Sequence, residues 1–313
     1  MLGIVILNYK TFGDTVNCIE SISKTIGDIK HTVYIVDNVS PDNSFEALSM
    51  KYTDMQNVRV IQSEKNGGFS YGNNVGFRAA IADGCDKIIC TNSDVEFKDN
   101  SIRILVEDLD ESLDCAVIGP KVLCGDGSIQ NANKGILTAY RFFMRRKPFS
   151  WFDWFGVEKR YTYLNYNYEK PLYPAGMVSG CCFIIRASVL PEIGYLDEKV
   201  FLYHEENILG AKLKKAGYKV KLNPRSEIIH YGGKSTGEGK SAFVRYHSLA
   251  SALYYFKYYS DISRFAYTLV CSFIKSIFFL KGISDKTYKE YYRKIKRLIK
   301  SMKRGEEVYL NEV

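Results

Sequence analysis

The sequence predicts an α/β protein built on a mostly parallel sheet that is flanked by helices. Within the first 120 residues, short apolar runs of strand length alternate with segments whose apolar residues recur at helical spacing. The runs are continuously apolar, which is typical of parallel strands covered on both faces. The expected strands are Gly3–Asn8, His31–Asp37, Val58–Gln62, Lys87–Asn92 and Cys115–Val122.

Helices are expected between these strands and again further along the chain. Residues 11–24 place Val16, Ile19 and Ile22 on one face. Residues 125–175 follow no regular period, and we expect an irregular excursion there. The other expected elements are helices at 70–83, 99–111 and 206–216, a strand at Val178–Arg186, and short strands at Lys219–Asn223 and Glu227–Ile229.

The alternation stops near residue 241, which divides the chain into a domain of residues 1–240 and a helical, aromatic and basic extension of residues 241–313. Phe265–Leu280 is apolar apart from Lys275, but its sixteen residues fall short of the roughly 20 that span a bilayer. Residues 286–303 alternate apolar and basic positions with helical spacing, which predicts a basic amphipathic helix.

The net charge of +8 is concentrated in this extension. Residues 281–304 contain ten Lys or Arg and two acids, so the rest of the chain is close to neutral. This distribution argues against a nucleic-acid-binding surface. We expect residues 241–313 to attach to an anionic membrane surface without spanning it. The alternative is that these helices pack on the first domain or form an oligomer interface, with the lysines merely solvated.

The cysteines and the N-terminus indicate a reducing, cytoplasmic location. Eight cysteines are scattered without a CxxC pair, which argues against a structural zinc site and favours buried free thiols. The first residues form a short apolar strand without a basic leader or a cleavage site, so no signal peptide is expected.

Polar side chains follow three of the expected strands, at the edge where α/β sheets bind ligands. Asp37 is placed to accept hydrogen bonds from a nucleobase or ribose, although this segment taken alone fits better an Asx-rich turn that caps the next helix. Asp94 is placed to hold a hard divalent cation with positions open for phosphate oxygens, or else lies in an exposed turn.

Three further segments suit a site. The glycines of Asn66–Asn74 precede a helix, where they allow an anionic ligand to approach the backbone, or form an ordinary cap. Glu205 and Glu206 begin a helix, so one of them is placed to act as a general base, although the helix dipole alone favours acids there. His230 ends a strand. A lone histidine is more often structural than a ligand, so His230 is a candidate only because it occurs together with the other polar segments.

These segments occur in a characteristic order, which rests on Asn8–Tyr9, Asp37–Asn38 with Ser40, Asn66–Phe69 with Asn73, Asn74 and Gly76, Asn92–Val95, Ser179–Gly180, Gly194–Glu198, Phe201–Glu206, and His230–Gly233 with Ser235 and Thr236. The set resembles the inverting family 2 glycosyltransferases with the GT-A fold, especially their bacterial rhamnosyltransferase-like branch. The resemblance covers about residues 2–240.

The resemblance implies a role for each matching position. Asp37 would contact the nucleobase of a nucleotide-sugar, Asp94 would hold Mg²⁺ or Mn²⁺ against the diphosphate with help from His230, and Glu206 would be the catalytic base. Many members carry Asp where this chain has Asn92, so metal binding is expected to be weaker. Glu206 replaces an Asp, so Glu205 remains a substitute for it. The implied donor-nucleotide site is Asn8, Asp37, Asn38, Gly67, Gly68, Asn73, Asn92 and Ser93.

We therefore expect an inverting transfer of rhamnose or a hexose from a dTDP- or UDP-sugar. The expected acceptor is a hydroxyl of a lipid-linked or growing surface polysaccharide, such as a capsule or O-antigen, at the inner face of a bacterial membrane. A sugar-nucleotide-forming nucleotidyltransferase is one alternative, but the Gly-rich loop with Arg and Lys that it needs is replaced by Asn8–Gly13. A non-catalytic module of a polysaccharide assembly complex is another.

Overall fold

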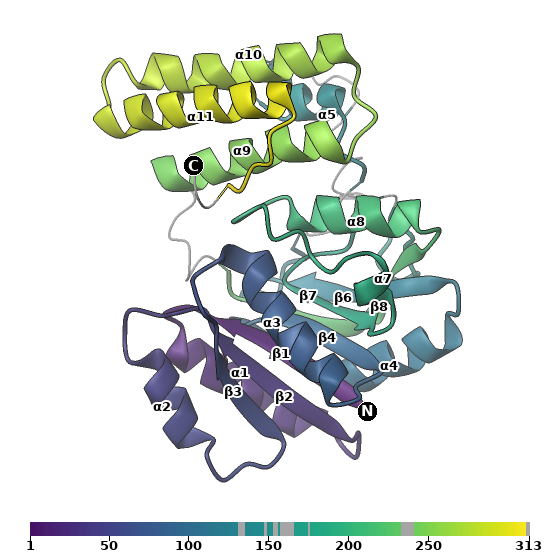
Figure 1. Cartoon of the computed structure of the whole chain (residues 1–313). Helices are drawn as coiled ribbons and strands as arrows, with labels where there is room; N and C mark the ends of the chain where they lie inside the picture. Colours follow the sequence, from purple (N-terminus) through teal and green to yellow (C-terminus); the bar gives the residue numbers. More distant parts are fainter. Residues whose placement is uncertain are drawn as a thin grey trace.

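A single eight-stranded sheet organises the computed structural model, which describes residues 1–130, 135–146, 149–152, 156, 166–174, 176–232 and 241–310. The strand order within these residues is β3-β2-β1-β4-β7-β6-β8-β5 (Figure 1). Four neighbouring pairs are parallel and three are antiparallel. The strands are β1 (Leu2–Asn8), β2 (His31–Asp37), β3 (Val58–Gln62), β4 (Lys87–Asn92), β5 (Val95–Phe97), β6 (Cys115–Leu123), β7 (Cys182–Arg186) and β8 (Lys219–His230).

Alternate residues of the central strands enter two separate cores, because successive side chains of a strand point to opposite faces. Ile4 and Ile6 of β1 join the core beneath α1 (Phe12–Thr25), α2 (Ser44–Lys51) and α4 (Ser101–Glu111). Val5 joins the opposite core, beneath α3 (Gly68–Ala82), α7 (Val189–Glu192) and α8 (Glu205–Lys215). Burial on both faces explains why these strands are continuously apolar in the sequence.

The extension forms a helical bundle whose own core is separate from the two sheet cores. Its helices are α9 (Ala242–Tyr258), α10 (Arg264–Lys281) and α11 (Lys286–Arg304), joined by α5 (Ala139–Met144), while Phe149–Phe152 forms a short 3-10 helix. The bundle lies beyond α8, at the pole opposite α2 (Figure 1). Each of the three long helices begins at a side-chain cap, at Ser241, Ser263 and Asp285.

The apolar stripe of α11 lies inside this bundle. Ile295, Leu298 and Met302 are buried in the same core as Tyr246 of α9 and Ile274 of α10. The basic residues between them face outward. The amphipathic pattern of residues 286–303 is therefore satisfied by packing against helices of the same chain.

The α/β class with a C-terminal helical part is confirmed, and several element boundaries differ from expectation. The three-residue strand β5 was not expected, nor was helix α5 within the excursion at 125–175. The two short strands expected after α8 form one strand, β8, with a register shift opposite Pro120 and Lys121. The helical extension is interrupted between Tyr258, which ends α9, and Ser263, which caps α10. Gly233, Ser235 and Thr236 lie outside the described residues.

Candidate active site

One cleft opens where the carboxyl ends of β1, β2 and β4 meet. The register pairs Asn8 with Asp37 and Leu7 with Asn92, so these strand ends lie side by side. The cleft has a volume of about 950 Å³. Eight predicted site residues from five separate segments line it: Asn38, Gly68, Asn92, Ser93, Asp94, Glu205, Glu206 and His230.

The other four predicted residues are buried behind this lining. Asn8, Asp37 and Asn73 have no exposed surface, and Gly67 is also buried. The Asp37 carboxylate accepts hydrogen bonds from the Asn8 amide at 2.6 Å, and from the Ser40 backbone N–H at 2.8 Å and hydroxyl at 2.7 Å. Asp37 thus shapes the loop after β2, and its contact with a nucleobase stays a prediction.

The loop after β2 is held in an uncommon conformation. Asn38 donates to the Asn66 side chain at 2.9 Å and to the Gly68 carbonyl at 3.2 Å. Val39 follows with a φ of 57°, which is an outlier for a β-branched residue. Strained residues of this kind persist where the surrounding contacts enforce them, and they cluster at functional sites. The hydrogen bonds of Asn38 supply that enforcement here.

Gly68 joins the first turn of α3 to the segment that precedes α8. Its φ is +84°, and a Cβ at this position would lie 2.0 Å from the Phe201 carbonyl oxygen. That same carbonyl accepts a hydrogen bond from the Phe69 backbone N–H at 3.0 Å. Only glycine allows this approach, so α3 and the segment 201–206 are fixed relative to each other across the cleft.

Replacing Gly68 by alanine is expected to lower the free energy of unfolding by about 2–5 kcal/mol, because left-handed strain and overpacking add. Urea denaturation measures this change. The control is Gly13→Ala, where an added Cβ meets no atom within 4 Å and alanine suits the helix. Equal stability of the two variants would contradict the role assigned to Gly68.

Asp94 and His230 form the centre of the polar wall. They meet because β5 pairs with β8, which places Val95 opposite His230. Asp94 Oδ1 lies 3.3 Å from His230 Nε2, and the Asn92 amide lies 3.4 Å from the same nitrogen. Gln130 Oε1 lies 2.8 Å from His230 Nδ1. Gln130 therefore orients the imidazole so that Nε2 faces Asp94.

The pair fits a divalent cation. Neighbouring ligands of an octahedral Mg²⁺, each about 2.1 Å from the ion, lie about 3 Å apart, close to the 3.3 Å observed between Oδ1 and Nε2. Among the described residues, no third His, Cys, Asp or Glu is placed to complete a metal-binding group with them. Asp94 and His230 would thus hold the ion and leave positions for phosphate oxygens.

Charge also binds the two groups together. Burial lowers the pKa of His230, but hydrogen bonds to Asp94 and Cys181 raise it to about 10. The imidazole is thus held next to the carboxylate. A bound cation would take the place of the Nε2 proton, because metal-ligating histidine is neutral.

Glu205 and Glu206 enter the cleft from the first turn of α8, where the helix dipole favours acids. Glu205 is buried and Glu206 is half-buried. The two preceding residues, Tyr203 and His204, have φ values of 70° and 67°. Two consecutive left-handed residues turn the chain sharply into α8, so this strained turn sets the direction of the paired carboxylates.

Several residues that line the cleft were not predicted as site residues, among them Gln130, Tyr9, Phe201 and Phe243. Gln130 carried no sequence signal, because it lies in the irregular stretch after β6. Tyr9 and Phe201 belong to segments that carry the family resemblance, and that membership was the signal that could have identified them. Phe243 is the second residue of α9, in the extension, and no spacing in the sequence connects it with the cleft.

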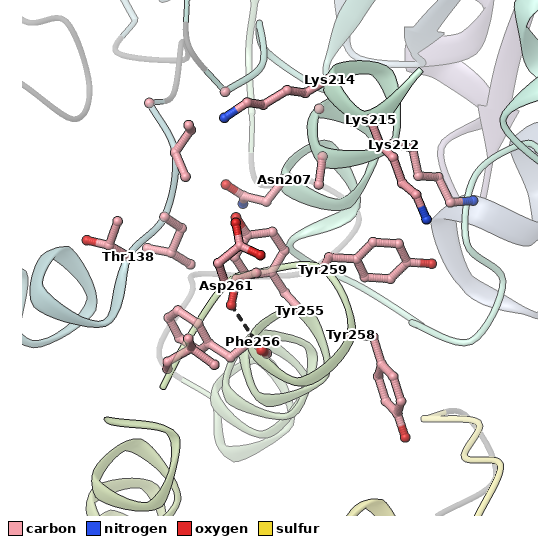
Figure 2. Close-up of a pocket in the computed structure, with 18 of the residues that line it drawn as sticks. Thr138, Asn207, Lys212, Lys214, Lys215, Tyr255, Phe256, Tyr258, Tyr259 and Asp261 are labelled. Carbon is pink, nitrogen blue, oxygen red and sulfur yellow. Dashed lines mark hydrogen bonds between the residues drawn. The ribbon is translucent and has the colours of Figure 1, made fainter. Parts of the chain in front are cut away.

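A second cavity of about 1260 Å³ lies on the opposite side of α8 (Figure 2). Asn207 and Lys214 of α8 line it, together with Thr138 and the aromatic C-terminal end of α9. None of the twelve predicted site residues lines it. Helix α8 thus separates the polar cleft from this cavity.

Comparisons with known proteins give one consistent picture. A sequence model described as "Glycosyl transferase family 2" matches residues 3–194. The N-acetylglucosaminyl-diphospho-decaprenol L-rhamnosyltransferase of Mycobacterium tuberculosis is 27% identical over 233 residues, which are 71% of this chain and 74% of that protein.

Solved structures share the fold at low sequence identity. The structure of GalNAc-T7 with UDP, GalNAc and Mn²⁺ has a TM-score of 0.57 and 16% identity, and the match covers 85% of this chain but only 53% of that one. The structure of S. aureus TarS 1-349 with UDP-GlcNAc has a TM-score of 0.52 and 15% identity, with 90% and 74% covered. The expected GT-A fold is confirmed.

Proposed function

The chain belongs to glycosyl transferase family 2, and we propose that it transfers rhamnose or a hexose, with inversion, from a dTDP- or UDP-sugar to a hydroxyl of a lipid-linked or growing surface polysaccharide. The rhamnosyltransferase relative is named for a lipid-linked N-acetylglucosamine acceptor. The GalNAc-T7 and TarS structures hold UDP or UDP-GlcNAc. Both observations support this choice of donor and acceptor.

The single observation that carries the proposal is the sharing of one cleft by Glu206, Asp94 and His230. Inversion requires a base on the face of the sugar opposite the leaving group. Glu206 is placed to take the proton of the acceptor hydroxyl as that oxygen attacks the anomeric carbon. In this proposal Asp94 and His230 would lie at the diphosphate, where a bound Mg²⁺ or Mn²⁺ would neutralise the charge that develops on the leaving group.

The proposal is tested with the purified chain, Mn²⁺ and a panel of nucleotide-sugars that includes dTDP-rhamnose and UDP-hexoses. An N-acetylglucosaminyl-diphospho-lipid and simple glycosides serve as acceptors. We expect one donor to be consumed and the product to have the anomeric configuration opposite to the donor, which NMR measures. A product with the donor's configuration would contradict inversion.

The same assay, repeated with a nucleoside triphosphate and a sugar 1-phosphate as substrates, separates the alternatives. A nucleotidyltransferase would make a nucleotide-sugar and pyrophosphate from a nucleoside triphosphate and a sugar 1-phosphate. A non-catalytic module would bind donor without consuming it. Either result would replace the proposed reaction.

The extension suits attachment to the anionic inner face of a cell membrane. No helix among the described residues is long and apolar enough to cross a bilayer. The stripe of α11 is buried, but α10 carries exposed apolar side chains at Phe265, Leu269, Phe279 and Leu280, and Ile283 follows. The Phe279 ring of α10 lies 5.7 Å from the Tyr292 ring of α11, and Lys289, Arg293 and Lys296 around Tyr292 are exposed. An apolar stripe beside basic residues is the pattern of helices that lie in the membrane interface.

Reversing the charge of Lys286, Lys289 and Arg293 to Glu is expected to weaken binding to anionic liposomes roughly 100-fold, because each basic residue contributes about 1 kcal/mol at such a surface. All three are exposed on α11. Co-sedimentation at low and high salt measures the effect, and high salt should abolish the binding of the unmodified chain.

The matched control reverses Lys24, Lys30 and Lys51, which are exposed near α1 and α2, at the other pole of the molecule. It makes the same change in net charge but should keep the binding. If both triple variants lost liposome binding equally, the effect would be one of net charge and not of the α11 surface. Co-sedimentation of the unmodified chain with neutral liposomes would contradict the electrostatic attachment.

A further inference from the structure

The wall of the cleft beside Glu206 is aromatic, in contrast to the polar wall around Asp94. Phe201, Leu202 and Tyr203 line it from the segment before α8, and Phe243 lines it from α9. Phe243 is 41% exposed, and it is more exposed than the other three side chains of this wall. It also lies outside the residues 3–194 that match the family model. Phe243 is therefore the residue by which the C-terminal extension contributes to this wall.

The two phenylalanines form a packed unit. The Phe201 and Phe243 rings lie 6.1 Å apart at 87°, the edge-to-face arrangement that aromatic pairs prefer. The His247 ring supports both, 4.8 Å from Phe201 and 4.4 Å from Phe243. His247 is only 6% exposed, and burial, with Lys294 nearby, lowers its pKa to about 4. The support is thus a neutral aromatic ring.

Hydrogen bonds join α9 and the residue that follows it to the segment 197–202, which leads into the turn at Tyr203 and His204. The Ser251 hydroxyl donates to the Leu202 carbonyl at 2.8 Å. The Tyr254 and Tyr259 hydroxyls both donate to Asp197 Oδ2, at 3.0 and 2.5 Å. Because Leu202 immediately precedes Tyr203 and His204, these bonds fix Phe243 relative to the start of α8. The aromatic unit is thus a rigid part of the cleft.

We propose that Phe201 and Phe243 form a platform for the acceptor sugar ring, whose hydroxyl then reaches Glu206. This rests on the proposed glycosyl transfer. A sugar ring presents C–H groups on its faces and hydroxyls at its rim, so an apolar wall next to a carboxylate matches both parts. The nucleotide diphosphate is anionic and polar, and the polar lining of Asn92, Asp94 and His230 would match it once a divalent cation is bound there. Rigid aromatic anchors orient a ligand at low entropic cost.

The test measures acceptor and donor parameters separately for Phe243→Ala, with Phe243→Leu as a second variant that keeps apolar bulk without the ring. For both we expect the KM for the N-acetylglucosaminyl-diphospho-lipid to rise at least 10-fold. The Kd for dTDP and UDP with Mn²⁺, measured by calorimetry, should change less than twofold. Phe243→Tyr, which keeps the ring, should restore most of the acceptor affinity.

The control is Leu113→Ala, which removes an apolar side chain that is 81% exposed, does not line the cleft and lies outside the extension. An unchanged acceptor KM in both Phe243→Ala and Phe243→Leu would overturn the platform, although wild-type transfer would leave the proposed function standing. A weakened nucleotide Kd would overturn it in favour of base stacking. A wild-type chain that transfers no sugar would overturn both proposals.

Discussion

Glu206→Gln is expected to slow sugar transfer by roughly 10²–10⁴-fold, the usual contribution of a general base. Glutamine keeps the size and position of the side chain at the start of α8 but cannot accept the proton of the acceptor hydroxyl. The Kd for nucleotide should stay within about twofold, because uncharged replacement on this wall leaves the Asp94 side of the cleft intact. Initial rates at saturating donor and acceptor measure the first quantity, and calorimetry measures the second.

Glu205→Gln is the matched control, since it makes the same change one residue earlier in the same helical turn. Glu205 is more buried than Glu206, so a modest loss of stability and a small change in rate are expected. A large loss of rate in Glu205→Gln with normal turnover in Glu206→Gln would transfer the role of base to Glu205.

Removal of the divalent cation is expected to abolish transfer, and Asp94→Ala is expected to weaken Mn²⁺-dependent nucleotide binding by at least roughly 100-fold, or about 3 kcal/mol. The reason is that the carboxylate both binds the ion and balances its charge. His230→Ala should act in the same direction. Calorimetry of UDP and dTDP with and without Mn²⁺ measures the effect. Full activity in excess EDTA would remove the metal from the mechanism.

Gln130→Ala gives a sharper test of the same site. Gln130 contacts His230 at 2.8 Å and is not itself a predicted ligand, and loss of such an orienting partner costs about 10–100-fold in metal affinity. The control is Asp28→Asn. The Asp28 side chain is 86% exposed and does not line the cleft. Unchanged Mn²⁺ affinity in Gln130→Ala would show that the imidazole needs no such support.

The central sheet was predictable because buried parallel strands form continuous apolar runs, and β2, β3 and β4 begin and end at the predicted residues. The strand β5 was not, since three residues carry too little periodicity. Its pairing with β8 is nevertheless what joins Asp94 to His230. The contact between two site residues thus depended on an element too short to recognise in the sequence.

The extension shows a different limit of prediction. The stripe of residues 286–303 identified an amphipathic helix correctly, but periodicity records only that an apolar face needs a partner. In the structure that partner is α9 and α10, and the exposed apolar residues belong to α10. Phe243 was beyond prediction for a similar reason, because its place in the cleft follows from tertiary packing alone.

The contact of Asp197 with Tyr254 of α9 and with Tyr259, which follows that helix, has a consequence for the exchange of the extension between relatives. It joins the wall that carries Phe243 to a segment just beyond the residues that match the family model. Exchange of residues 241–313 with those of a relative would therefore replace Phe243 together with both tyrosines, and would leave Phe201, Asp94 and His230 in place.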